Sequence, residues 1–498
     1  MNKKPVLLIS FHNQKALGVR YLEKSLKSAG YEVNIIFFKG FNSVKPDSAS
    51  KEELSLLKAA IDKINPGLIG LSVMTSLYLE TVYAVNSAIK SNFNNIPVLW
   101  GGVYATLFPE KCLEQADFVI RGEGEHAIIE LTDAIYNNLP FDGIKNLAFK
   151  KQEGIIINEV RALCQNLDEF GYPEIGGDNK YYINNDKISQ GDPQLNSVSF
   201  ELTASRGCPF VCSYCCSVNL HRVYKGMGGY VRFRSVSSVM DELREAKSKL
   251  KNLKVVHFWD EIFSDDENWI HEFTIRYKRE INLPFEIWGH PLKVNRAFIK
   301  SLVDTGLYKV VMGIQSGSPR VRKEIFHRVE KQEDIINASR ILAECRVPQV
   351  IYDFMLQHPF ETDKDIRQTY ELCTQLAPPF ELQLHGLNFL PGTDIVEKAV
   401  KMNILSSEDL EKIMYSPIQD QYNMYWGYKN TSMMSKFWYA LTYMSQFGIT
   451  RPVARYFANT HKSTPAVKLA LILYKIARPL SRVRYLYKKG MIVLKAFR

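Results

Sequence analysis

Short apolar segments alternate with longer amphipathic segments along the first 140 residues of the chain. The apolar segments have the length of buried strands, whereas the segments between them repeat apolar residues at helical spacing. Between residues 78 and 90, for example, Leu79, Val82 and Ile89 fall on one face of a helix. The predicted strands are Val6–Ser10, Val33–Phe38, Leu68–Ser72, Pro97–Gly101 and Phe118–Arg121.

This alternation predicts an α/β fold for residues 1–140, with a doubly wound, Rossmann-like parallel sheet. Such sheets bind ligands in the loops that follow the carboxyl ends of their strands. The first of these loops, Phe11–Gly18, contains no G-x-G-x-x-G pattern, which disfavours a nicotinamide dinucleotide. The other predicted ligand loops are Val73–Leu77, Gly102–Phe108 and Gly122–Glu125.

Residues 141–197 have little periodic pattern and several turn residues, so we interpret them as a linker between domains. A second strand–helix series then covers residues 198–415. Its six units predict a partial (β/α)6 barrel, an incomplete form of the eightfold barrel with its chemistry at the carboxyl ends of the strands. The predicted strands are Ser199–Thr203, Val255–Trp259, Phe285–Trp288, Lys309–Ile314, Val350–Met355 and Glu381–Leu387.

The last segment, 416–498, is predicted to be mostly helical and is distinct in charge. Residues 421–498 hold fourteen Lys or Arg and no Asp or Glu, so the net charge of +10 is concentrated there. Interleaved aromatic residues suit an anionic membrane or lipid-linked substrate, the protein's own domains, or nucleic acid. We favour the membrane or lipid contact, and nucleic acid is the least favoured partner.

The chain's length and cysteine content add two constraints. Its 498 residues exceed what one hydrophobic core supports, so two or more domains are expected. No secretory signal and no apolar stretch of ~20 residues is present, so we expect a cytoplasmic protein, with peripheral membrane attachment through its basic segment. In that reducing compartment, clustered cysteines indicate metal binding rather than disulfides. Four of the eight cysteines are clustered, at positions 208, 212, 215 and 216.

Three of these cysteines, Cys208, Cys212 and Cys215, have C-x3-C-x2-C spacing and follow the first strand of the second series. Three thiolates can hold a [4Fe–4S] cluster while one iron keeps an open coordination position. A zinc site is the alternative, but structural zinc prefers C-x2-C pairs and four ligands. Cys216 lies outside the spacing, and we expect it to take no part.

With Tyr214 before the third cysteine, the segment Arg206–Cys215 resembles the radical S-adenosylmethionine superfamily. The resemblance covers roughly residues 197–415. It implies that S-adenosylmethionine binds the open iron, and that one electron from a donor such as flavodoxin or ferredoxin cleaves it to a 5′-deoxyadenosyl radical. It also implies the S-adenosylmethionine-binding residues Tyr214, Asp260, Glu261, Gln315 and Ser316, with Asp260 ahead of Glu261 at the amino group.

Motifs in residues 1–140 resemble the cobalamin-binding domain that precedes many radical domains, such as Trp100–Thr106 and Arg121–Glu125. The Asp-x-His-x-x-Gly motif that supplies an axial imidazole in classical cobalamin proteins is absent. The lower face of cobalt is therefore unassigned, and we interpret the loop residue His12 as a polar surface group rather than a ligand. The implied cobalamin-binding residues are Leu17, Gly18, Ser72, Thr75, Gly101, Gly102, Tyr104, Gly122 and Glu123.

Together these resemblances imply a radical enzyme that uses a [4Fe–4S] cluster, S-adenosylmethionine and cobalamin to methylate an unactivated carbon of a small-molecule or lipid-like substrate. Three alternatives stay open: a cyclase or rearrangement enzyme without methyl transfer, a radical-type RNA-modifying enzyme, and a non-enzymatic metal- or corrin-binding module. His358 replaces the Gly that is usual before the proline of its motif, and we interpret it as a wall specific to the substrate.

Overall fold

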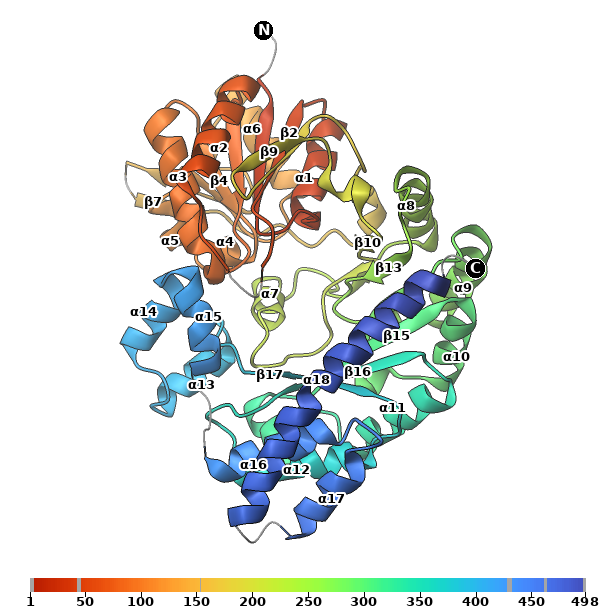
Figure 1. Ribbon diagram of the computed structural model, residues 1–498. Helices are drawn as coiled ribbons and strands as arrows, with labels where there is room; N and C mark the ends of the chain where they lie inside the picture. The colour runs from red at the N-terminus through yellow and green to blue at the C-terminus, as the bar shows by residue number, and fades with distance from the viewer. Residues whose placement is uncertain (1–3, 43–45, 153, 428–431, 461–463, 496–498) are drawn as a thin grey trace.

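The computed structural model describes residues 4–42, 46–152, 154–427, 432–460 and 464–495. It has the α/β architecture expected from the sequence. Figure 1 shows the N-terminal sheet unit above an open barrel, with the helices of the C-terminal segment beside the barrel. The two large sheets have nine and six strands, and a two-stranded ribbon lies between the first two strands of the six-stranded sheet in the sequence.

The first sheet has the strand order β7-β6-β5-β4-β3-β1-β2-β8-β9. The pairs from β5 to β8 are parallel, and β1 lies between β3 and β2, so the winding direction reverses at β1. In such sheets the ligand binds at that reversal point. All five predicted strands are present: β1 (Val6–Phe11), β2 (Val33–Phe38), β3 (Leu68–Ser72), β4 (Val98–Gly101) and β5 (Phe118–Ile120).

Helices cover both faces of this sheet, as the doubly wound prediction requires. On one face, α1 (Leu17–Ser28) and α6 (Glu125–Asn137) enclose one hydrophobic core. On the other face, α2 (Lys51–Ile64) and α3 (Leu79–Asn92) enclose a second core. The strands are apolar throughout because both of their faces are buried. Shorter helices in the loops are η1 (Ser76–Tyr78), α4 (Val103–Leu107) and α5 (Pro109–Leu113).

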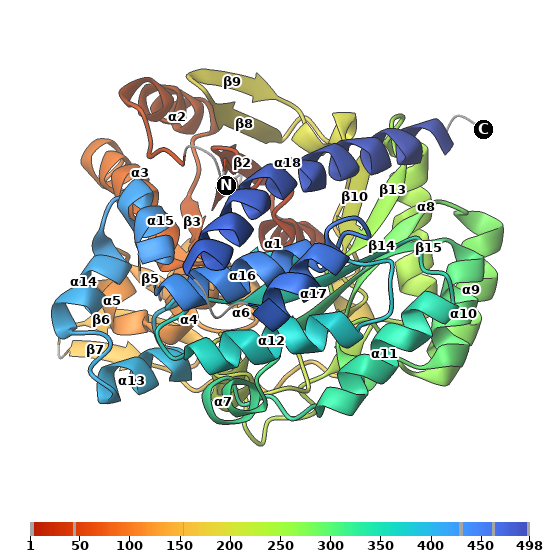
Figure 2. The same ribbon diagram turned by 60° about the horizontal axis from the view of Figure 1, so that its bottom comes forward.

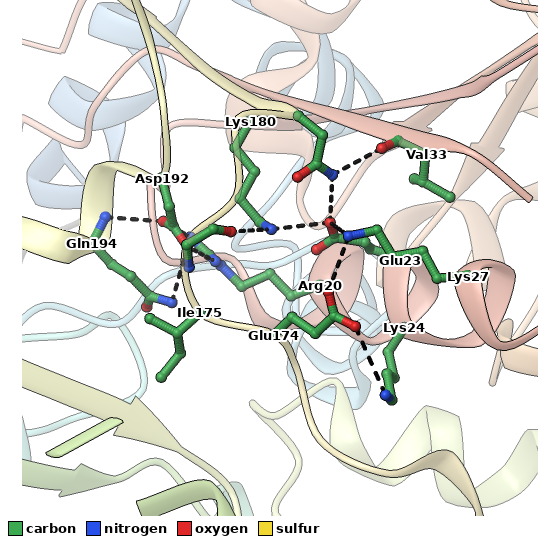
Figure 3. A network of polar contacts seen from close by, with 12 residues as sticks. Arg20, Glu23, Lys24, Lys27, Val33, Glu174, Ile175, Lys180, Asp192 and Gln194 are labelled. Carbon is green, nitrogen blue, oxygen red and sulfur yellow. Dashed lines mark hydrogen bonds and ion pairs between the residues drawn. The ribbon is translucent and has the colours of Figure 1, made fainter. Parts of the chain in front are cut away.

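Residues 141–197, predicted as a linker, supply four more strands to the first sheet. A buried ion network fixes this stretch to α1 (Figure 3). Arg20 binds Asp192 at 2.8 Å and Glu23 binds Lys180 at 2.9 Å, and all four side chains are almost fully buried. The added elements are β6 (Leu147–Lys151), β7 (Gly154–Ile157), η2 (Leu167–Phe170), β8 (Lys180–Asn184), β9 (Lys187–Gln190) and η3 (Pro193–Asn196).

The second sheet is the predicted six-stranded open barrel, and all of its neighbouring strands are parallel. Its strands are β10 (Ser199–Leu202), β13 (Val255–Phe258), β14 (Phe285–Gly289), β15 (Leu307–Gln315), β16 (Gln349–Met355) and β17 (Glu381–His385). The helices outside it are α8 (Val236–Lys249), α9 (Glu267–Glu280), α10 (Arg296–Thr305), α11 (Gln332–Glu344) and α12 (Asp363–Gln375). Between β10 and α8 lie β11 (Ser205–Arg206), α7 (Ser217–Val223) and β12 (Arg232–Phe233), and the remaining short helices are η4 (Pro291–Lys293) and η5 (Val321–Ile325).

The described part of the C-terminal segment is mostly helical, as predicted, and it packs on the barrel. Phe437, Trp438 and Leu441 of α16 form a buried cluster with Ile366 and Tyr370 of α12. Figure 2 shows α16 against α12. No helix among the described residues is both long enough and apolar enough to cross a bilayer. The helices α13 (Asp394–Lys401) and α14 (Ser407–Tyr415) precede the segment, and its own helices are α15 (Ile418–Gly427), α16 (Met433–Met444), α17 (Arg451–Thr460) and α18 (Thr464–Lys495).

This packing is the second of the three contacts that we considered for residues 421–498. It explains the aromatic content of α16 without a membrane. Contact with a membrane surface stays a prediction, and residues 428–431, 461–463 and 496–498 of the segment lie outside the described residues.

Candidate active site

The three cysteines of the C-x3-C-x2-C motif lie in the loop between β11 and α7, at the carboxyl edge of the barrel sheet. Each is partly buried. Burial raises the pKa of Cys208 to about 12, and the nearby Cys212, Glu261 and Cys215 add to this effect. Cys208 is therefore within electrostatic reach of two more thiols and one carboxylate, and a bound cation would stabilise such groups because metal ligands must be deprotonated.

Two aromatic side chains hold the cysteine loop against the barrel. Phe210 stacks on His290, with ring centroids 3.7 Å apart. The hydroxyl of Tyr214 accepts a hydrogen bond from Arg328 at 3.0 Å, and Arg328 also donates to the carbonyl of Gly313 at 2.7 Å. The loop is thus fixed at the carboxyl ends of β14 and β15, opposite the strand from which it starts.

A cavity of about 410 Å³ lies between the carboxyl edge of the first sheet and the cysteine loop. Trp259, Glu261 and Arg206 line it from the barrel side. From the first sheet it is lined by seven of the nine residues predicted for cobalamin, namely Leu17, Gly18, Ser72, Gly101, Gly102, Gly122 and Glu123.

Glycines keep this cavity open. A Cβ atom at Gly18 would have no neighbouring atom within 4 Å, and one at Gly101 would meet only a carbonyl oxygen at 3.9 Å. Gly102 has φ +104°, and a Cβ there would lie 2.7 Å from the carbonyl of Val73. Only glycine fits at that position without strain. The first sheet therefore presents backbone, rather than side chains, to a flat ligand.

Charged contacts close the cavity on the side where the two sheets meet. The carboxylate of Glu123 accepts two hydrogen bonds from Arg232, at 2.8 and 3.0 Å, and one from Arg206 at 3.1 Å. Arg206 also binds Glu125 at 2.6 Å and lies over the ring of Tyr21. We call these contacts of Glu123 and Glu125 with Arg206 and Arg232 the domain clamp, because they join the two sheets.

Two family models match the chain on either side of this cavity: the B12 binding domain over residues 6–132 and the radical SAM superfamily over residues 202–373. The chain is a radical S-adenosylmethionine enzyme with a cobalamin-binding domain. Among curated relatives, an uncharacterized methyltransferase of Pyrococcus horikoshii is 25% identical over 402 residues, covering 80% of this chain and 81% of the relative. An anaerobic magnesium-protoporphyrin IX monomethyl ester cyclase of Cereibacter sphaeroides is also 25% identical, covering 72% and 56%.

Solved structures share the fold of this radical S-adenosylmethionine enzyme. The radical methyltransferase TsrM from Kitasatospora setae, solved with cobalamin and a [4Fe–4S] cluster, has a TM-score of 0.63 at 17% identity and covers 80% of this chain and 78% of its own. The cobalamin-dependent enzyme OxsB, with aqua-cobalamin and S-adenosylmethionine bound, has a TM-score of 0.66 at 14% identity and covers 98% and 81%.

The residues of this radical enzyme fit its cofactors. Three thiols on one loop match the donor set of a cluster with an open iron. The match to the radical SAM superfamily model over residues 202–373 includes these thiols and supports the cluster over the zinc alternative. The glycine-lined cavity fits a flat corrin, with Gly18 as the position that any side chain would fill.

The structure places the two acidic candidates after β13 in different surroundings. Asp260 is buried, and its carboxylate accepts hydrogen bonds from the backbone N–H of Ala204 at 3.0 Å and from the hydroxyl of Ser205. Burial raises its pKa to about 6. Glu261 instead lines the cavity. Both residues stay predictions for the amino group of S-adenosylmethionine, and of the two only Glu261 lines the described cavity.

The candidates after β15 also differ in their access to a ligand. Gln315 ends the strand in the left-handed region, with φ +67°, and its side chain lies over Gly313. Ser316 is fully buried, its hydroxyl accepts from the N–H of Ser318 at 3.2 Å, and its carbonyl accepts from Arg322 at 2.8 Å. Gln315 therefore stays a candidate for S-adenosylmethionine, whereas Ser316 stabilises the turn.

Two predicted cobalamin residues lie off the cavity. The hydroxyl of Thr75 caps η1 by accepting from the N–H of Leu77 at 3.3 Å. Tyr104 is buried, and its ring lies 5.0 Å from that of Phe108. Both residues shape the walls of the domain, and their spacing after β3 and β4 gave no sign of the direction in which they point.

Two histidines differ from their sequence interpretation. His12 is buried rather than on the surface, its Nε2 lies 3.1 Å from the hydroxyl of Thr81, and its ring stacks on Tyr78. His358 is also buried and its ring packs near Phe326, so it lies behind the site and forms no substrate wall.

The residues that sequence reasoning missed are Arg206 and Arg232 of the domain clamp and Arg328 behind Tyr214. Arg206 and Arg232 begin segments that resemble the family, but their spacing did not show that both contact Glu123.

Proposed function

We propose that this enzyme transfers a methyl group to a carbon atom of a small-molecule substrate. The observation that carries the proposal is the shared cavity: Gly18 and Gly102 of the cobalamin-binding domain face Trp259 and Glu261, which follow the strand beside the cysteine loop. When bound, the cofactors supply radical cleavage of S-adenosylmethionine and a methyl group on cobalt. The placement of the cavity brings both sources to one space.

The protein's own part is to position these groups and to exclude water. Glu261 offers a carboxylate for the amino group of S-adenosylmethionine, and Gln315 offers an amide at the next-but-one strand of the sheet. The domain clamp, through Glu123 and Arg232, keeps the two halves of the cavity at a fixed separation. Fixed separation matters because catalytic geometry must hold within fractions of an ångström.

Relatives support methyl transfer over cyclisation. A cytidylyl-2-hydroxyethylphosphonate methyltransferase of Streptomyces wedmorensis is 23% identical and covers 66% of each chain. The uncharacterized methyltransferase noted above is covered over 81% of its length, against 56% for the cyclase. The cyclase is the second candidate function. A lipid-like substrate and an RNA substrate have no direct support, because α16 uses its aromatic residues for packing.

The test is an anaerobic reconstitution with iron, sulfide, cobalamin and S-adenosylmethionine labelled in its methyl group. We expect 5′-deoxyadenosine after reduction, and labelled methyl on cobalt. Cys208→Ala should abolish 5′-deoxyadenosine, whereas Cys216→Ala, which removes the neighbouring thiol outside the spacing, should retain it. Wild-type yield from Cys208→Ala would refute the radical assignment. A preparation that makes 5′-deoxyadenosine without labelling cobalt would point to the cyclase instead.

A further inference from the structure

A second cavity, of about 640 Å³, lies at the carboxyl end of β17, and we call it the β17 cavity. Three distant parts of the chain form its walls. Gln383 and His385 lie on one face of β17, Ser76 and Leu77 follow β3, and Tyr422 belongs to α15. A cavity of this volume can hold a typical small-molecule ligand.

The β17 cavity and the cobalamin cavity are both lined by the loop after β3. Ser72 and Met74 line the cobalamin cavity, whereas Ser76 and Leu77 line the β17 cavity. A third cavity, of about 770 Å³, shares Ser72 and Met74 with the cobalamin cavity and Phe41 with the β17 cavity. The carboxyl end of β17 also lies at the same edge of the barrel sheet as the cysteine loop. The β17 cavity therefore lies beside the cobalamin cavity and at the edge of the sheet that carries the cysteine loop.

The wall from the C-terminal segment is anchored to the cobalamin-binding domain. The side chain of Gln421 donates to the carbonyl of Ser416 at 2.9 Å and of Ser76 at 3.3 Å. The N–H of Ile418 donates to the carboxylate of Glu80 at 2.9 Å. Figure 1 shows α14 and α15 directly below the first sheet unit. The first helices of the segment thus act as a fixed wall of the cavity.

The lining of the β17 cavity combines apolar side chains with neutral polar groups such as the amides of Gln383 and Asn388. It contains no Lys, Arg, Asp or Glu among the residues that the structure describes. The amides of Gln383 and Asn388 have no hydrogen-bond partner within the described chain, so both are available to a ligand. Aromatic rings of Phe41, Phe389 and Tyr422 complete the lining. This combination suits a flat ring with neutral hydrogen-bonding groups.

A buried carboxylate behind the wall opposes anions. Oδ1 of Asp353 is buried without a hydrogen-bond partner and lies 3.8 Å from Nε2 of His385. Asp353 thus lies next to the imidazole of His385, and the described lining offers an anion no Lys or Arg. A phosphate or carboxylate placed there would be desolvated without a counter-ion, which is costly.

We propose that the β17 cavity is the substrate site, and that it takes an uncharged, ring-bearing molecule with amide, hydroxyl or ring-nitrogen groups. That the ligand is the substrate rests on the proposed function, whereas the class of ligand is inferred from the cavity alone. This ligand differs from the lipid-like molecule expected from the sequence, because an anionic headgroup finds no partner there.

The experiment compares a neutral probe with an anion of the same shape. Binding of indole-3-acetamide, indole-3-acetate and glycerol 3-phosphate to the full-length protein is measured by ligand-observed NMR titration. We expect the amide to bind about tenfold more tightly than the acetate, because the anion has no counter-ion, and glycerol 3-phosphate to show no binding. Asn388→Arg should reverse the order, whereas Gln375→Arg, on α12 outside the barrel, should leave it unchanged.

Several results would overturn the proposal: no binding of the amide, equal or tighter binding of the acetate or phosphate, or a preference that Asn388→Arg does not change. None of these measurements uses the cluster or cobalamin. If no 5′-deoxyadenosine forms but the neutral probe is still preferred, the proposed function is refuted and the ligand class stands. If 5′-deoxyadenosine forms but the neutral probe is not preferred, the ligand class is refuted and the proposed function stands.

Discussion

The guanidinium of Arg328 donates a hydrogen bond to the hydroxyl of Tyr214 across 3.0 Å, from behind the cysteine loop. Arg328 is buried and also pairs with Glu330. Its charge acts on Cys212, where it opposes the effect of burial on the thiol pKa. The loop that carries the cluster ligands is thus both held and electrostatically biased by one side chain.

Replacing Arg328 should make the cluster harder to reduce. Arg328→Met removes a buried positive charge near Cys212, so we expect a more negative midpoint potential, because that charge favours the reduced cluster. Arg328→Lys keeps the charge and should shift the potential less. The measurement is a redox titration followed by electron paramagnetic resonance. Tyr214→Phe, which loses only the hydroxyl, is the matched control, and equal potentials in Arg328→Met and wild type would contradict the expectation.

Filling the cobalamin cavity at Gly18 should block the corrin without unfolding the protein. Gly18 lies in α1, where leucine favours the helix, and an added Cβ has free space. We expect Gly18→Leu to lose corrin uptake while its iron content and melting temperature stay at wild-type values. Corrin absorbance after gel filtration measures this. Gly143→Leu, also in free space but outside the cavity, should bind corrin normally. Normal uptake by Gly18→Leu would place the corrin elsewhere.

Breaking the domain clamp should destabilise the contact between the two sheets. Glu123→Gln leaves the buried guanidinium of Arg232 without its carboxylate partner. Loss of one partner of a fully buried pair costs roughly 3–5 kcal/mol, and we expect about 2 kcal/mol here, since Glu123 is partly exposed. Denaturant unfolding and limited proteolysis measure the change. Glu130→Gln, whose exposed carboxylate pairs with Arg161, should cost less than about 1 kcal/mol.

His12 should make the protein less stable in mild acid. Burial lowers its pKa from the ordinary value of 6.5 to about 4. The unfolded chain therefore takes up the proton first, and stability falls as the pH drops from about 6.5 towards 4, by about 2 kcal/mol at pH 5. His12→Asn suits the left-handed backbone at φ +53° and removes this group.

The melting temperatures of His12→Asn and wild type, compared at pH 7.5 and pH 5, test this. The melting temperature of His12→Asn should fall less than that of the wild type between pH 7.5 and pH 5. Parallel losses would show that another group sets the acid sensitivity. The corrin spectrum of the variant should match that of the wild type, because the Nε2 atom of His12 is used by Thr81.

The strands and the cysteine site were predictable because their signals are local. An apolar run such as Val33–Phe38 can be recognised as a strand without knowing which strand it pairs with. The three cysteines can be recognised as a motif because they lie within one short stretch of sequence. The strand β8 was missed because its pairing with β2 is long-range, while nearby turn residues weaken its pattern. The sequence could not show that Asp260 is buried whereas Glu261 lines the cavity, because both follow β13 in a loop whose path depends on the fold.

The buried pairs of Arg20 with Asp192 and of Glu23 with Lys180 decide where this molecule can be cut. A fragment ending at residue 140 would keep Arg20 and Glu23 inside α1 while discarding both of their partners. Recombination between related enzymes, in the laboratory or in evolution, should therefore succeed with joints near residue 197 and fail near residue 140. The corrin-carrying module is inherited together with the strands that follow it.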